Sequence, residues 1–301
     1  CNVEEVASLG SLVDSKTQGN PFFINQFLKS LYSDNLIRFD YQQGAWQWDL
    51  QQIQAQEITD NVVRLMATKL QKLPVATQAI LKQAACIGNQ FDLRTLEIVG
   101  EHLAFETARL LRPAIAEGLI LPLSPTYKLG ELEVQGLITA IKIEYKFAHD
   151  QIQQAAYSLI PDSQKAALHY LVGQLLLTHT ALQQRERKIF DIVKHLNLAK
   201  HLIFEGEQRE KLAELNLQAG KKAKASAAFE SAYYYFQTGL SLLPQESWQH
   251  NYDLTLTLHQ EAVESGYLSN HFEEAETLAK IGIEKARTQL DTVTLYEVRI
   301  R

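Results

Sequence analysis

Apolar side chains recur every three or four residues through most of the chain, which is the period of one face of an α-helix. Residues 2–18 show this period first, and it stops at a glycine. The helix predicted there carries its apolar face at Val3, Val6, Leu9 and Val13.

A Gly-Asn-Pro corner, Gly19-Asn20-Pro21, precedes the next helical pattern. Asparagine is a favoured N-cap residue, and proline suits the first helical position because no backbone hydrogen bond is lost there. The corner therefore predicts a helix that begins at Pro21 and ends near Asn35. The apolar face of this helix consists of Phe23, Phe27 and Leu31.

The stretch LIRFDYQQGAWQWDL changes to a period of two. Alternation of apolar and polar residues on both sides of Gly44 predicts a β-hairpin that turns at this glycine. The alternating apolar positions are Ile37, Phe39, Tyr41, Trp46 and Trp48.

Residues 59–160 return to the helical period and end in two short apolar stretches. The first helix has Asp60 as its candidate cap, and further helices are predicted in VATQAILKQAACIG, FDLRTLEIVG and AFETARLLRPAIAEGLI. LILPLSPTYKL and IKIEYKF have the pattern of two strands joined by a long, irregular connection. Helices followed by a two-stranded wing predict a winged helix.

Beyond Pro161 the pattern predicts helices only. Two segments superpose with large and small residues at matching places, as in tetratricopeptide repeats, where small residues let two helices approach closely. Their offset is 43 residues, compared with the usual value of about 34, and PQESWQHNYD is the predicted place of the extra residues. The matching positions are Phe229, Ala232, Phe236, Gly239 and Pro244 in the first segment and Phe272, Ala275, Ala279 and Gly282 in the second.

The composition narrows the classes of function. The formal net charge is −6, with 13 basic and 17 acidic side chains in residues 1–160 and 16 and 18 in residues 161–301. Neither half is basic, which argues against binding of nucleic acid. No apolar run approaches the length of a membrane span, and no stretch has the pattern of a signal peptide. The two cysteines, Cys1 and Cys86, favour a reducing, cytoplasmic compartment over a disulfide framework.

Two features predict that the sequence is a piece of a longer protein. It begins with Cys1, and its single methionine is Met66. It stops at TLYEVRIR, within a helical pattern. We interpret this as a truncated reading frame in preference to a lipid-modified N-terminal cysteine.

Motifs of catalysis are missing from the sequence. The phosphate loop G-x-x-x-x-G-K-[ST] does not occur, because the pair Gly220-Lys221 lacks both the upstream glycine and the hydroxyl residue. Neither a kinase catalytic loop nor a nucleophile elbow is present, and no Cys/His cluster has zinc spacing. We therefore expect the chain by itself to catalyse nothing and to hold no cofactor or metal.

The pair His149-Asp150, in YKFAHDQIQQAAY, allows several interpretations. An adjacent His-Asp occurs in metal-dependent phosphohydrolases, but that site needs several ligands that converge. A phosphoaccepting histidine would need flanking residues that this sequence lacks. The simplest interpretation is a helix N-terminus, with His149 as a cap or boundary residue and Asp150 at the positive end of the helix dipole. The other candidate metal ligands lie on separate predicted elements, at His102, His169, His195 and His201.

The third helix of the predicted winged helix, AFETARLLRPAIAEGLI, is the candidate for reading DNA. It carries Arg109 and Arg112, but also Glu106 and Glu117. A helix that reads DNA normally has more net positive charge. We therefore expect this domain to couple other parts of the protein and to bind no nucleic acid.

Four stretches together resemble the predicted-ATPase region of very large bacterial, especially cyanobacterial, signalling kinases. They are TQGNPFFINQFLKSLY, the WQWD hairpin, LPVATQAILKQAACIGNQFDL and YKFAHDQIQQAAYSLIP. The resemblance covers nearly the whole chain and is strongest through Pro161. Such proteins place a serine/threonine kinase domain first, followed by a STAND-class P-loop ATPase, helical repeats, a GAF sensor domain and a histidine kinase.

The resemblance assigns a nucleotide site to the corner. In STAND ATPases a Gly-x-Pro motif begins a helix of the lid domain, and its proline packs against the adenine. Gly19, Asn20 and Pro21 match that motif. Glycine permits a close approach, and proline presents a rigid apolar surface.

The resemblance also gives His149 and Asp150 a role. Nucleotide-sensing immune receptors of the same class have a Met-His-Asp motif at the end of the winged helix, and its histidine contacts the β-phosphate of ADP and holds the closed state. Ala148-His149-Asp150 resembles it, with alanine in place of methionine.

The fold expected on this basis is mainly α in three parts. Residues 1–58 would be the end of a STAND lid with a hairpin, residues 59–160 a winged helix, and residues 161–301 a tetratricopeptide-like repeat array.

The resemblance implies a regulatory segment of a signal-transduction kinase. It would couple the nucleotide state of an upstream P-loop ATPase domain, which binds ATP or ADP with Mg²⁺, to downstream sensor and kinase domains. Proteins would bind the repeats, membranes would not be bound, and the oligomeric state is left open. The alternative is a segment of a STAND-type transcription regulator with its DNA-binding domain outside this chain. GAF and histidine-kinase motifs after Arg301, or a basic helix-turn-helix there, would separate the two.

Overall fold

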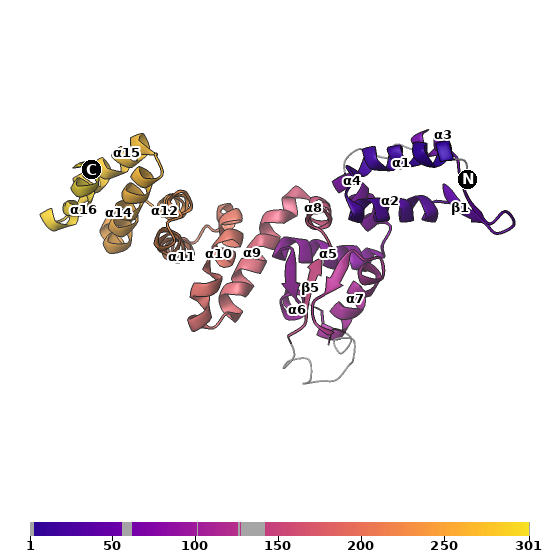
Figure 1. Ribbon diagram of the computed structural model, residues 1–301. Coiled ribbons are helices and arrows are strands. Elements are labelled where there is room, and N and C mark those ends of the chain that lie inside the picture. The colour runs from indigo at the N-terminus through magenta and orange to yellow at the C-terminus, as the bar shows by residue number, and fades with distance from the viewer. Residues whose placement is uncertain (1–2, 56–61, 101, 126, 128–141, 301) are drawn as a thin grey trace. The chain divides into compact units, whose positions relative to one another are not determined.

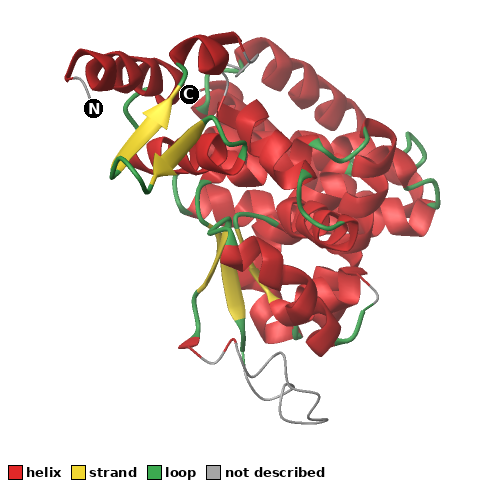
Figure 2. Ribbon diagram, turned by 90° about the vertical axis from the view of Figure 1, so that its right-hand side faces the viewer, coloured by secondary structure: helices red, strands yellow, loops and turns green. Residues whose placement is uncertain are grey.

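The structure, a computed structural model, describes residues 3–55, 62–100, 102–125, 127 and 142–300. It divides into two compact units, Cys1–Pro161 and Asp162–Arg301. Helices dominate both units, and the strands belong to two small antiparallel sheets (Figures 1 and 2), so the prediction of a mainly α fold is confirmed. No helix in these ranges is long and apolar enough to cross a membrane.

The first unit begins with the two helices and the hairpin that the sequence predicts. Asn20 caps the second helix, as expected, and the hairpin turns at Gly44, which has φ of 60°. The elements are α1 (Val3–Thr17), α2 (Pro21–Ser33), β1 (Ile37–Asp40), β2 (Ala45–Trp48) and the short helix α3 (Leu50–Ala55) (Figure 1). Their small core consists of Val13, Phe27, Leu31, Ile37 and Ile53.

The remainder of the first unit combines helices with a sheet of order β3-β5-β4. The helices are α4 (Val62–Gln71), α5 (Val75–Ile87), α6 (Leu93–Gly100), α7 (Ala104–Ala116) and α8 (Asp150–Ser158), and the strands are β3 (Gln90–Asp92), β4 (Ile120–Pro122) and β5 (Glu144–Phe147). Figure 2 shows the three strands side by side. The predicted cap Asp60 and most of the connection between β4 and β5 lie outside the described residues.

The prediction of a two-stranded wing was wrong in the number of strands. β3 also pairs with β5, with Phe91 opposite Tyr145. Three residues are too few for the period of two to be visible, and the strand forms because β5 offers it a free edge. Asp92 directly precedes α6, the helix predicted in FDLRTLEIVG, and its carboxylate accepts from the backbone N–H of Thr95 at 2.8 Å.

Helix α2 is shared by two cores. Phe27 and Leu31 belong to the small core described above, whereas Phe23 lies in the large core of the first unit, with Met66 of α4 and Phe147 of β5. These three α2 side chains are four residues apart and lie on one face of the helix. One rigid element therefore joins the Gly-Asn-Pro corner to both cores.

The second unit contains only helices among its described residues. They are α9 (Asp162–His179), α10 (Leu182–Leu198), the 3₁₀ turn η2 (Lys200–Leu202), α11 (Gly206–Ala225), α12 (Phe229–Leu242), α13 (Ser247–His250), α14 (Tyr252–Leu268), α15 (Phe272–Lys285) and α16 (Gln289–Ile300). Helix α11 packs on α12, α12 on α14, and α14 on α15.

The predicted superposition of two segments agrees with the helix boundaries. Phe229 and Phe272 are the first residues of α12 and α15. Ala232 and Ala275 are the fourth residues of these two helices, and both are fully buried. The predicted insertion contains the short helix α13, which accounts for part of the longer offset.

Candidate functional site

The Gly-Asn-Pro corner is a tight turn with its proline exposed. Gly19 has φ of 70° and follows Gln18, which is also left-handed at 55°. The Asn20 side-chain oxygen accepts from the backbone N–H groups of Phe22 at 3.0 Å and Phe23 at 3.4 Å. Pro21 lies at the surface. The corner therefore presents a rigid apolar ring, while its own polar groups serve the helix.

His149 is the N-cap of α8, as the simplest interpretation of the pair required. Its backbone is extended, and its Nδ1 accepts from the backbone N–H of Gln151 at 3.3 Å. An accepting Nδ1 leaves the proton of a neutral ring on Nε2. No described residue binds Nε2, so this N–H is the group that a ligand could use. Asp150 is the first residue of α8 and is exposed.

The structure brings the corner and His149 together. The Phe22 ring lies nearly parallel to the imidazole, with ring centroids 5.7 Å apart and planes at 16°. Phe23 meets the same imidazole edge-on, at 4.7 Å and 65°. Both phenylalanines follow Pro21 directly. Two segments about 130 residues apart in the sequence thus meet through Phe22, Phe23 and His149. We call the corner, these two rings and the His149-Asp150 pair the patch. The five predicted site residues belong to these two segments (Gly19, Asn20, Pro21, His149 and Asp150).

Phe22 was not predicted as part of this patch. Helical periodicity singles out the face of Phe23, Phe27 and Leu31, and Phe22 does not lie on that face. Its place beside a Gly-Asn-Pro corner was the available signal.

Polar contacts also tie α2 to the helices beside it. Lys69 of α4 donates to the side-chain oxygen of Gln26, a buried residue of α2, and its ammonium lies 3.2 Å from the Glu117 carboxylate. Lys72 pairs with Asp34 at 2.7 Å. These contacts lie at the middle and at the C-terminal end of α2, whereas Phe22 and Phe23 hold its N-terminal end.

A metal site at His149 was one of the interpretations left open. Within the described ranges, neither His149 nor Asp150 belongs to a group of three or more potential ligand atoms close to one another.

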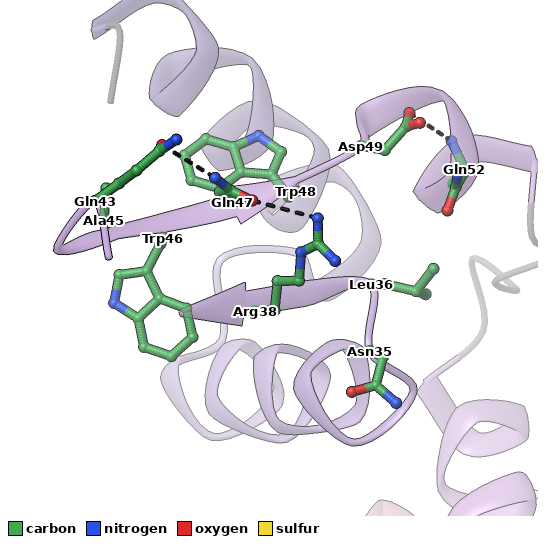
Figure 3. Close-up of a pocket in the computed structure, with 10 residues that line it drawn as sticks. All are labelled: Asn35, Leu36, Arg38, Gln43, Ala45, Trp46, Gln47, Trp48, Asp49 and Gln52. Carbon is green, nitrogen blue, oxygen red and sulfur yellow. Dashed lines mark hydrogen bonds between the residues drawn. The ribbon is translucent and has the colours of Figure 1, made fainter. Parts of the chain in front are cut away.

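A concave surface lies on the hairpin (Figure 3). It encloses about 560 Å³ and is open to solvent. Its polar side chains are bonded to one another: Arg38 donates to Gln47 at 3.4 Å, and Gln47 donates to Gln43 at 3.1 Å. These bonds, drawn in Figure 3, stabilise the hairpin. None of the five predicted site residues lines this surface.

Two of the scattered histidines meet in the second unit. His169 of α9 and His195 of α10 are buried, and their Nδ1 atoms are 2.8 Å apart. One ring must donate and the other accept. Burial lowers the pKa of His169, and nearby Lys194 lowers it further. Burial also lowers the pKa of His259, although the bond of its Nδ1 to the Thr255 carbonyl partly offsets this.

These lowered pKa values predict that acid destabilises the second unit. Both histidines bind protons less readily in the folded chain than in the unfolded chain, where the imidazole pKa is about 6.5. The free energy of unfolding should therefore fall as the pH drops through this value. Urea midpoints measured between pH 7.5 and 5.5 test this. The double variant His169→Gln, His259→Gln should flatten the pH dependence, and exposed His201→Gln should not. A slope that persists in the double variant would assign the effect elsewhere.

The chain is similar to a region of signal-transduction histidine kinases. Hybrid signal transduction histidine kinase G of Dictyostelium discoideum is 30% identical over 328 residues, which cover 94% of this chain and 10% of that protein. Peroxide stress-activated histidine kinase mak3 of Schizosaccharomyces pombe is 22% identical over 298 residues, which cover 93% of this chain and 12% of that protein.

The chain thus spans about a tenth of the length of these curated relatives. Neither relative is cyanobacterial, so the bacterial origin stays a prediction. No family model and no solved structure matches the chain. The similarity supports the signalling-kinase part of the resemblance, and the ATPase part stays a prediction.

Proposed function

We propose that the chain is a regulatory segment of a multi-domain signalling kinase. In this role it couples the nucleotide state of an upstream P-loop ATPase domain to sensor and kinase domains. The observation that carries the proposal is the patch formed by the Gly-Asn-Pro corner and His149. The similarity to two histidine kinases over more than nine-tenths of the chain favours this function over a transcription regulator.

In this proposal α1, α2, α3 and the hairpin are the end of a STAND lid, and α4 to α8 with their sheet are a winged helix. Helices α9 to α16 are tetratricopeptide-like repeats that present surfaces to protein partners. The order of elements supports these assignments, because two helices and a hairpin come first, helices with a small sheet follow, and helices alone come last. Cytoplasmic location and the absence of nucleic-acid binding belong to the same proposal.

The residues of the patch suit a nucleoside diphosphate. Bound ADP, or ATP with Mg²⁺, supplies a flat base and a charged phosphate chain. Pro21 offers an exposed apolar face to the base, and Nε2 of His149 offers one donor to a phosphate oxygen. Asn20 is engaged as a cap, and Asp150 stabilises the first turn of α8. One apolar face and one donor are too little for tight binding, so we expect the phosphate loop of the longer protein to supply the remainder.

Substitution of His149 tests the proposal in the longer protein that carries the phosphate loop. A charge-assisted hydrogen bond is worth about 1.5–3 kcal/mol, so His149→Ala should speed ADP dissociation about tenfold to hundredfold. The closed state would be less populated, and basal kinase output should rise. Stopped-flow release of a fluorescent ADP analogue measures the rate.

Two further variants separate nucleotide contact from helix capping. His149→Asn keeps a favoured cap and removes the imidazole, so it should release ADP as fast as His149→Ala while α8 stays capped. His102→Ala changes an exposed histidine of the same unit and should leave the rate unaltered. An ADP dissociation rate in His149→Ala equal to that of the unmodified protein would rule the nucleotide role out.

A further inference from the structure

The imidazole of His149 is held on three sides. Phe22 stacks on one face with ring centroids 5.7 Å apart, and Phe23 contacts the ring edge-on with centroids 4.7 Å apart. The backbone N–H of Gln151 donates to Nδ1. A ring held in this way has one preferred tautomer and one direction in which its Nε2–H can point. The two phenylalanines therefore determine how His149 can meet a ligand.

The same two phenylalanines are part of the corner. Pro21 fixes its own backbone angle, and the Asn20 side chain binds the N–H groups of both aromatic residues. Phe23 is 2% exposed and anchored in the large core. The corner therefore cannot move relative to this core unless the rings that touch His149 move too.

We propose that Phe22 is the positioning residue that couples the corner to His149, so that the two nucleotide contacts act as one switch. This inference rests on the proposed nucleotide role of the patch and adds the regulation of that site. Phe22 is the informative residue because it is only partly buried beside the core, and leucine can replace it without opening a large cavity. A stacked pair of rings is worth about twofold to tenfold in an equilibrium.

The first test needs no nucleotide and uses the chain itself. Nitrogen NMR of histidine-labelled protein, with His149→Asn to assign the signal, should show one tautomer of His149 with the proton on Nε2. Phe22→Leu should let the imidazole turn away from the Gln151 N–H that holds Nδ1 as an acceptor, and should therefore convert this signal to an average of tautomers. Phe39→Leu is the matched control, because Phe39 is also a partly buried ring with aromatic neighbours, on the hairpin. An unchanged His149 signal in Phe22→Leu would overturn the inference.

The second test measures coupling in the longer protein. ADP dissociation rates of Pro21→Ala, His149→Ala and the double variant form a cycle that reports whether the two contacts act together. If the two contacts were independent, the double variant would release ADP at a rate given by the product of the two single effects. We expect its ADP dissociation rate to be about twofold to tenfold lower than that product. In a Phe22→Leu background this coupling should vanish.

The outcomes distinguish this inference from the proposed function. If His149→Ala speeds ADP release but the coupling survives in Phe22→Leu, the nucleotide role stands and the coupling role of Phe22 is wrong. If His149→Ala alone has no effect on ADP release, the nucleotide role fails and this inference fails with it.

Discussion

Gly220→Ala should destabilise the second unit by about 2–3 kcal/mol, even though alanine is the better helix former by about 1 kcal/mol. Gly220 lies in α11, where a Cβ atom would be 2.3 Å from Cε1 of Phe236 and 2.6 Å from two more atoms of that ring. Phe236 is completely buried between α11 and α12. The ring cannot withdraw without moving one helix away from the other, so the cost of the added methyl group exceeds its gain in helix propensity.

Urea unfolding of the full chain, followed by circular dichroism, measures this loss. Gly206→Ala is the matched control, because Gly206 is the first residue of the same helix and a Cβ there would have no neighbour within 4 Å. The control should be neutral or slightly stabilising. Hydrogen exchange should locate the loss of protection in α11 and α12. Equal effects of the two substitutions would mean that the helices tolerate the extra methyl group.

Close approach at other glycines of the second unit was predictable from the sequence. Gly239 and Gly282 stand at matching places in two segments that begin with Phe229 and Phe272, and local periodicity is enough to find them. A Cβ atom at these glycines would lie 2.9 Å from Leu258 and 2.7 Å from Leu295. Gly220 lies outside both segments, so its contact with Phe236 was not predicted. Helix boundaries and the hairpin followed from equally local signals, such as the Asn20 cap and Gly44. Elements that depend on short-range patterns are therefore the ones that the sequence reveals.

Long-range contacts explain what the sequence did not reveal. β3 is three residues long and exists because β5, more than fifty residues later, pairs with it. The contact of Phe22 with His149 likewise joins segments far apart in the chain. Sequence patterns and family resemblance singled out Pro21 and His149 separately, but neither source says that aromatic rings connect them.

Buried polar residues are a second feature that periodicity hides. Asn197 and Asn216 interrupt the apolar faces of α10 and α11, yet they are 8% and 0% exposed. Their amides exchange two hydrogen bonds, of 2.8 Å from Asn197 to Asn216 and 2.9 Å in return. Asn216 donates a further bond to the Leu212 carbonyl at 2.9 Å. Each buried amide needs the other as its hydrogen-bond partner, and the two meet only at one relative position of the helices along their axes. The pair therefore sets the register of α10 against α11.

Asn216→Ala should therefore cost about 3 kcal/mol, which is a larger loss than the deleted side-chain volume alone implies. The two hydrogen bonds between the amides and the bond from Asn216 to the Leu212 carbonyl disappear, at about 1 kcal/mol each, and the amide of Asn197 is left buried without its partner. Exposed Gln218→Ala, two residues further along α11, should change the stability by less than about 0.5 kcal/mol.

The decisive measurement is the double variant Asn197→Leu, Asn216→Leu. Removal of both amides leaves no unpaired polar group. The double variant should therefore regain most of the free energy of unfolding that the single variants Asn197→Leu and Asn216→Leu each lose. A double loss equal to the sum of the two single losses would show that the amides do not act as a pair. If the pair sets the register, the double variant should also show broadened NMR signals in α10 and α11 at unchanged helix content, because apolar surfaces can slide past one another where paired amides cannot.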